Sequence, residues 1–180
     1  MRYWAIALVP QWTADVQAMV ARLMEPYNQA LIAPPYKKYL SEQATKGHTA
    51  RLGVTPGDFE TLAARLNAHY AATMDLTTHF QSDALGIFVW AALNPNGKYT
   101  RWSLNSLTDD VWPVSALPRD LLRDLAPHAV ITPDGHWHEL FPNIWGAIPT
   151  AQDKLRIVRE AYGLIDLYPD HLAVRLECHV

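Results

Sequence analysis

The sequence predicts an α+β fold, with one mixed, mainly antiparallel sheet of about five or six strands and helices packed mostly on one face. Three observations predict it. Apolar or alternating runs typical of strands are interspersed with amphipathic runs typical of helices. Tight turns join some neighbouring strands, which indicates antiparallel pairs. The 180 residues are 49% hydrophobic, enough for a full core, and we expect a single domain over 1–180.

The first third of the chain predicts a strand followed by a helix. Residues 3–9 are apolar at every position, so this strand should be central in the sheet. A helix is expected over 13–24, with Thr13 as its cap. Residues 26–53 are predicted to be irregular, apart from one or two helical turns over 36–40.

The middle of the chain predicts a helix, two strands and a short helix. Thr55 is the expected cap of the first helix, and Pro56 follows at its first position. Residues 86–93 are wholly apolar and should form a strand in the middle of the sheet. The tight turn over 94–97 leads to a strand over 98–104, and a short helix is expected at about 118–125.

The last third predicts a hairpin, a helix and a final strand. The hairpin covers 128–140. The last helix should begin at Thr150, with Asp153 completing a capping box. Residues 172–180 alternate, which predicts a strand with one apolar face. That face comprises Leu172, Val174, Leu176, Cys178 and Val180.

Composition excludes several classes of protein. The net charge of -3 and the pI of about 6.2 give no positive field, so nucleic acid is not expected as a direct ligand. A single cysteine, Cys178, excludes an internal disulfide framework. The longest apolar run is too short to span a bilayer, and no signal peptide is evident, so we expect no membrane association and a cytoplasmic location.

The hairpin has a turn with a clear physical basis. Pro133 presets the first central dihedral of a type I turn, and Gly135 suits the left-handed position of a bulge. This turn places Val130 opposite His138 and directs Trp137 toward the core. Three histidines should then share the polar face of the ribbon: His128, His136 and His138.

These histidines allow two kinds of chemistry. His136 and His138 would lie about 6.6 Å apart at Cα, a spacing that suits two ligands of one zinc ion, with His128 as a third ligand. Alternatively, His138 and Glu139, joined by His179 from the final strand, would do acid–base work near neutral pH. A solvated polar face with no chemistry is the simpler interpretation.

Two further patterns carry less information. In Glu177-Cys178-His179 the thiol and the imidazole are neighbours in a strand, so they point to opposite faces and cannot pair. Asp109 and Asp110 either bind a metal or lie in a solvated loop. No phosphate-binding loop, dinucleotide fingerprint, nucleophile elbow or Cys-x-x-Cys pair occurs.

The 7 Trp and 8 Tyr residues leave two interpretations open. Trp4, Trp90 and Trp137 fall in predicted strands, where core positions are expected. Other rings fall in loops or irregular segments. There they either cover the sheet or form a recognition surface for a protein partner, because Trp, Tyr and Arg dominate binding hot spots. The candidate binding residues are Tyr36, Trp112, Phe141 and Trp145.

The segment 129–139, with its Thr-Pro-Asp-Gly-x-Trp-His-Glu pattern, resembles a group of small uncharacterised proteins of phages and bacterial mobile elements. The acidic-Cys-His-aliphatic tail at 177–180 and the first strand ending in Val9-Pro10 are similar too. Related sequences have Gly-Gly-Arg-Trp where this chain has residues 104–108, so an activity carried there would be absent. The resemblance implies that the protein belongs to a phage or a mobile element, and it implies no particular reaction.

Two hypotheses from different classes follow. The preferred one is a non-enzymatic phage-type accessory protein that needs no cofactor and binds a macromolecular partner, for example as an anti-CRISPR-like inhibitor of a host defence complex. The alternative is a small metal-dependent or His-dependent hydrolase, with zinc as the expected metal, centred on His136, His138 and Glu139. The sequence does not decide whether the protein is an enzyme, and it sets no oligomeric state.

Overall fold

The computed structural model describes residues 2–73, 79–141 and 150–180. Contacts within the chain divide it into two compact units. Unit 1 comprises Met1–Leu31 and Asn94–Val180, and unit 2 comprises Ile32–Leu93. The expectation of a single domain over 1–180 did not anticipate this division. That the two units unfold together, as one domain would, stays a prediction.

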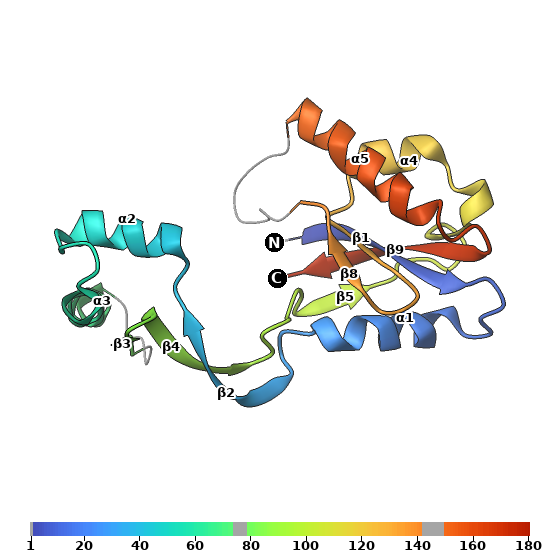
Figure 1. Cartoon of the computed structure of the whole chain (residues 1–180). Helices are drawn as coiled ribbons and strands as arrows, with labels where there is room; N and C mark the ends of the chain where they lie inside the picture. Colours follow the sequence, from blue (N-terminus) through green and yellow to red (C-terminus); the bar gives the residue numbers. More distant parts are fainter. Residues whose placement is uncertain (1, 74–78, 142–149) are drawn as a thin grey trace. The chain divides into compact units, whose positions relative to one another are not determined.

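Unit 1 is built on a mixed six-stranded sheet, which confirms the predicted α+β class (Figure 1). The strand order is β5-β9-β1-β7-β8, and β6 also pairs with β9. β1 pairs in parallel with β7, while the other pairs are antiparallel. The strands are β1 (Arg2–Pro10), β5 (Arg101–Ser103), β6 (Val111–Pro113), β7 (Ala129–Ile131), β8 (Trp137–Glu139) and β9 (His171–His179). β1 is central, as its apolar sequence predicted.

Helices cover both faces of this sheet (Figure 1). α4 (Arg119–Leu125) and α5 (Ala151–Ile165) pack on one face, and α1 (Val16–Met24) packs on the other. Short 3-10 helices follow at η1 (Glu25–Tyr27) and η2 (Val114–Ala116). β1 lies between the two layers because its side chains alternate: Ala5 and Ala7 face α1, while Ile6 and Leu8 face α5.

The helix starts in unit 1 have identifiable caps. The Thr150 hydroxyl accepts from the Asp153 N–H at 3.1 Å, and the Asp153 carboxylate accepts from the Thr150 N–H at 3.0 Å, which confirms the predicted capping box. The first helix begins later than expected. Asp15, in place of Thr13, caps it by accepting from the Ala18 N–H at 2.9 Å.

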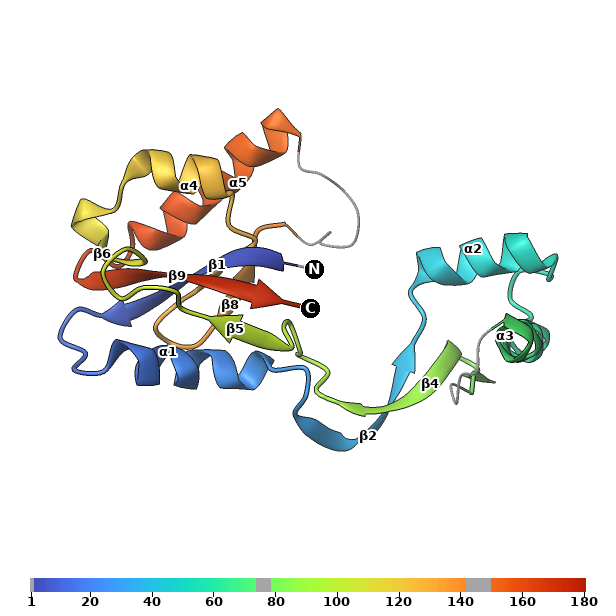
Figure 2. The same cartoon turned by 180° about the vertical axis from the view of Figure 1, so that it is seen from behind.

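Unit 2 has a three-stranded antiparallel sheet in the order β2-β4-β3 and two helices (Figure 2). Its elements are β2 (Ile32–Tyr39), α2 (Glu42–Leu52), α3 (Phe59–Thr73), β3 (Gln81–Asp83) and β4 (Gly86–Leu93). α3 packs on one face of the sheet, where Ile87 meets Leu62 and Leu66. The first residues of β4 are buried, and its second half is largely exposed.

The sequence prediction for 26–53 was wrong in two respects. Residues 36–40, expected as helical turns, belong largely to β2, because pairing with β4 outweighs the weak local preference. α2 was not predicted at all. Ser41 caps it and Gly53 ends it with a left-handed φ of 62°. No residue of α2 is buried, so the helix has no apolar stripe for the sequence to reveal.

The two units are joined where unit 2 begins and ends. Ile32 pairs with Leu93 across β2 and β4. Directly outside this pair, the Asn94 N–H donates to the Leu31 carbonyl at 2.8 Å. The predicted tight turn follows, with the Gly97 N–H donating to the Asn94 carbonyl at 3.0 Å. The chain therefore enters and leaves unit 2 through residues that lie next to each other.

In the parts of the chain that the structure describes, no helix combines the length and the apolar character that a bilayer crossing needs.

Candidate functional site

The hairpin adopts the turn that its sequence predicts. The Gly135 N–H donates to the Thr132 carbonyl at 2.8 Å, and the Thr132 N–H donates to the His136 carbonyl at 3.0 Å. Gly135 has a φ of 81°, which is favourable only without a side chain. Val130 pairs with His138, as expected. The Trp137 ring packs against the core on the α1 side, 5.0 Å from the Tyr27 ring.

His136 and His138 lie together on the other face of the ribbon. Their ring centroids are 4.6 Å apart, and His138 Nε2 lies 3.3 Å from Thr132 Oγ1. The Thr132 hydroxyl donates to Asp134 at 2.5 Å. Partial burial, followed by the neighbouring imidazole of His136, lowers the pKa of His138, so its neutral form is favoured. Both histidines line an open cavity of about 570 Å³, as does Glu160 of α5.

His128 has different neighbours. Its ring lies 5.3 Å from Tyr3 and 5.8 Å from Phe141, and burial lowers its pKa against the opposing effect of Glu139. Within residues 2–73, 79–141 and 150–180, no three His, Cys, Asp or Glu side chains are grouped so that they could hold a metal ion. In that part of the chain, the three histidines proposed as zinc ligands are therefore not gathered as one ligand set.

The three residues proposed for acid–base work have separate partners. His138 contacts His136 and Thr132, as described above. The Glu139 carboxylate accepts from Lys98 Nζ at 3.0 Å. His179 Nε2 lies 3.1 Å from the Glu177 carboxylate, on the final strand. None of the contacts that these three side chains make joins one of them to another.

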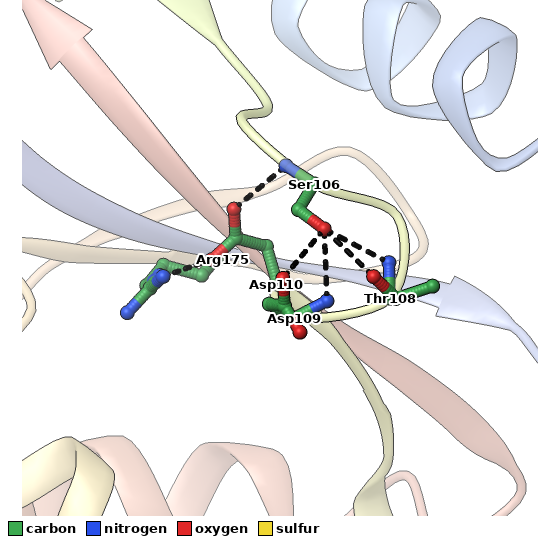
Figure 3. A network of polar contacts seen from close by, with 5 residues as sticks. All are labelled: Ser106, Thr108, Asp109, Asp110 and Arg175. Carbon is green, nitrogen blue, oxygen red and sulfur yellow. Dashed lines mark hydrogen bonds and ion pairs between the residues drawn. The ribbon is translucent and has the colours of Figure 1, made fainter.

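The Asp109-Asp110 pair is part of a structural network that fastens the loop before β6 to β9 (Figure 3). Asp110 is only 1% exposed and forms an ion pair with Arg175. It also accepts from the Ser106 N–H at 3.0 Å. The Ser106 hydroxyl donates to Asp109 at 3.0 Å and accepts from the Asp109 N–H at 3.1 Å. Both carboxylates therefore anchor this loop.

The candidate binding residues from the sequence are mostly covered. Arg175 lies over the rings of Trp112 and Trp4, with Cζ 5.8 Å and 5.1 Å from the two centroids. Phe141 is buried and Tyr36 is half-buried. Trp145 lies outside the described residues. The described members of this set therefore do not form one exposed surface.

An exposed aromatic surface lies instead on unit 2. We call it the aromatic face, and its members share the side of the sheet opposite Ile87: Lys37, Tyr39, Asp83, Phe88 and Trp90. Trp90 was predicted to be in the core, and this was wrong, since it is 55% exposed. In a strand, residues 37 and 39 share one face, and so do residues 88 and 90. This alternation could have placed Trp90 on an aromatic surface, but it was not recognised because residues 86–93 are apolar at every position.

The aromatic face is held in place by its own contacts. Phe88 is buried beneath its neighbours, with ring centroids 5.5 Å from Tyr39 and 6.0 Å from Trp90. Lys37 Nζ lies 4.4 Å from the Phe88 centroid. The Asp83 carboxylate accepts from Lys37 at 2.6 Å and from the Tyr39 hydroxyl at 2.8 Å. These two donors lower the pKa of Asp83 to about 2, so it stays ionised and fixes both side chains.

Comparisons with protein-family models, with curated proteins and with solved structures found no match to this chain.

Proposed function

We propose that this protein is a non-enzymatic accessory protein that binds a protein partner through the aromatic face of unit 2. The observation that carries the proposal is the exposure of Trp90, at 55%, on the same sheet surface as Tyr39, at 37%, whose hydroxyl donates to Asp83. Rigid Trp and Tyr side chains are the residues that most often supply binding energy at interfaces. Fixing them before binding lowers the entropic cost of association.

The charge of this surface favours a protein partner over a nucleic acid. Lys37 is the cation of the aromatic face, and Asp83 neutralises it at 2.6 Å. Residues 32–93 contain five Lys or Arg and five Asp or Glu, so unit 2 has no excess of positive charge. Binding to a phosphate backbone requires such an excess. An apolar patch rimmed by polar groups is typical of protein–protein contacts.

The biological setting of this proposal comes from the resemblance at 129–139 and 177–180. That resemblance supports a phage or mobile-element accessory protein, such as an anti-CRISPR-like inhibitor that docks on a host defence complex. A docking role needs a shaped surface and no catalytic group, which agrees with the separate partners of His138, Glu139 and His179.

The test is capture of a partner from bacterial host lysate, followed by binding measurements with the purified partner. Trp90→Ala should weaken binding at least tenfold, because it removes the largest exposed ring of the face. Trp12→Ala is the matched control. Trp12 is 77% exposed on unit 1, outside the aromatic face, so its removal should leave the dissociation constant unchanged. Equal binding by the Trp90→Ala variant and the unaltered protein would refute the proposal.

A second candidate function is a His-dependent or zinc-dependent hydrolase. The observation that favours it is the His136–His138 pair beside the Thr132 hydroxyl, at the edge of an open cavity. Elemental analysis of the purified protein and assays with generic ester and phosphoester substrates test it. Stoichiometric zinc or turnover, lost in His138→Ala, would favour the hydrolase. Partner binding that His138→Ala leaves unchanged would favour the binding protein.

A further inference from the structure

Unit 2 has a partly enclosed cavity of about 530 Å³, which lies between α2, the start of α3 and the turn from β3 to β4. Its apolar lining includes Leu40, Val54, Phe59 and Leu85. The first three of these residues also belong to the hydrophobic cluster around Ile87, so the cavity borders the core of the unit. Ile87 lies on the opposite side of the sheet from the aromatic face, and the cavity is therefore separate from that face.

Helix α2 forms one wall of this cavity. Thr45 and Thr49, one turn apart, line it together with Ala50. No residue of α2 is buried, although the helix has 11 residues. A helix of this length is marginal in water on its own, and most helical stability in proteins comes from the packing of one face. A molecule bound in the cavity would pack against the side of α2 that carries both threonines, and it would therefore stabilise the helix.

The polar groups of the lining indicate the chemistry of such a molecule. Among the described residues of the lining, the charged ones are Glu42 and Lys46, and they pair with each other at 2.6 Å. An ionic ligand would give up its hydration here without gaining an unpaired counter-ion. The Thr49 hydroxyl donates to the Thr45 carbonyl at 2.7 Å, so the lone pairs of its oxygen can accept from a ligand.

We propose that this cavity binds a neutral, mainly apolar small molecule that donates a hydrogen bond to the Thr49 hydroxyl. Small-molecule sites typically have volumes of about 300–1,000 Å³ and an apolar lining with a few polar groups, as this cavity has. Its described lining belongs wholly to unit 2, so the site is complete within that unit. The proposal goes beyond the proposed function and does not depend on it, because the cavity and the aromatic face are separate.

The first test is an amide NMR titration of the whole chain with 1-naphthol, which is neutral at pH 7, has an apolar ring system and carries one hydroxyl donor. The shifts should be saturable and should centre on Leu40, Ala50, Val54 and Phe59, which line the cavity. Two compounds with the same rings are the matched probes. Without the donor, 1-methoxynaphthalene should bind about two- to tenfold more weakly. The anion 1-naphthoate should also bind more weakly than 1-naphthol, because its carboxylate must be desolvated.

Variants of α2 test where the probe binds. Thr49→Val keeps the shape of the side chain and removes the hydroxyl, so 1-naphthol should lose its advantage over 1-methoxynaphthalene. Thr45→Trp and Ala50→Trp add a ring to the lining, and each should weaken 1-naphthol binding at least tenfold because the ring occupies the cavity. Gln43→Trp adds the same ring at an exposed position of α2 outside the lining, and it should leave binding unchanged.

Hydrogen exchange tests whether the bound molecule supports α2. At a 1-naphthol concentration ten times the dissociation constant, the α2 amides should exchange about tenfold more slowly, because the helix must release the ligand before it opens. Amides of α5 and β9 in unit 1 should be unchanged.

Four results would overturn the proposal. They are the absence of saturable shifts with 1-naphthol, shifts centred outside the cavity, equal binding by the unaltered protein and both cavity-filling variants, and unchanged exchange in α2. Tighter binding of 1-naphthoate than of 1-naphthol would overturn the assignment of a neutral ligand. Each of these results leaves the test of the aromatic face unaffected, since that test measures binding of a protein partner to the Trp90→Ala variant.

Discussion

Unit 1 and unit 2 use their apolar residues in different ways. In unit 1 the central strand β1 is buried on both faces. One hydrophobic cluster lies on each side of the sheet. Unit 2 has one small cluster around Leu62, Leu66 and Ile87. Five other large apolar side chains of the unit are exposed: Ile32, Tyr39, Leu85, Trp90 and Leu93. Unit 1 therefore has the larger core, and the exposed apolar side chains of unit 2 are those on which the proposed binding function depends.

The largest expected effect is in unit 1, where Arg175→Met removes the partner of buried Asp110. An unpaired buried carboxylate should lower the free energy of unfolding by about 3–5 kcal/mol, measured by urea unfolding. Arg2→Met is the control. It breaks an ion pair with Glu177 in which the Arg2 side chain is 72% exposed, and it should cost less than about 1 kcal/mol. Similar losses in the two variants would contradict the structural role assigned to the Asp110 network.

The next effect separates the two units. Leu66→Ala removes a fully buried side chain from the small cluster of unit 2 and should cost about 3 kcal/mol there. Two-dimensional amide NMR spectra should then lose the native signals of α2, α3 and β4 while keeping those of β1 and β9. Simultaneous loss of all native signals would show that the chain unfolds as the single domain expected from the sequence.

One alkaline pH effect should arise in unit 1, which holds the one cysteine of the chain. Burial raises the pKa of the Cys178 thiol to about 12 from its ordinary value of 9.0. Between these values the unfolded chain releases the proton and the folded chain keeps it. Stability should therefore fall as pH rises, by up to about 1.4 kcal/mol per pH unit. Burial also raises the pKa of Tyr3 and Tyr99 above the ordinary value of 10.0. Cys178→Ala should therefore reduce the slope between pH 9 and 10, and a fall due to the tyrosines should remain above pH 10. An unchanged slope between pH 9 and 10 would rule out the thiol as its source.

The smallest effect compares two helix caps. Thr150→Ala should lower the global stability of unit 1 by about 1 kcal/mol, because α5 buries Ile157, Ala161 and Ile165. Ser41→Ala removes a similar cap from α2, which buries no residue. Its effect should appear only as faster hydrogen exchange within α2, with no change in the urea midpoint of unit 1. A shift of that midpoint would show that α2 contributes to the stability of unit 1 as well as to its own.

Sequence patterns predicted unit 1 well, because there each local signal agrees with the buried surface. The alternation in 172–180 matches the two faces of β9, and the Pro133–Gly135 turn fixes the register of β7 and β8. β6 was missed since three residues that pair with β9 carry no periodicity of their own. In unit 2 the same reasoning failed, because β2 depends on its partner strand and α2 has no buried face.

The candidate site shows the same contrast. His136 and His138 share one face as predicted, because alternation within a strand is a local property. His128 and His179 depend on contacts with distant elements, which a single sequence does not reveal. Trp90 was misassigned to the core, because an apolar strand such as 86–93 is expected to be buried along its whole length. Here only the half that α3 and β3 reach is buried.

The adjacent ends of unit 2 have an evolutionary consequence. Since Leu31 and Asn94 are already hydrogen-bonded neighbours, the whole of 32–93 can be exchanged or deleted with no more than a short connecting turn. If unit 2 binds a partner as proposed above, a recombination event at this point would graft a new binding module onto an unchanged scaffold. A lineage under pressure to follow a changing target could therefore diversify what it binds while its folding core stays constant.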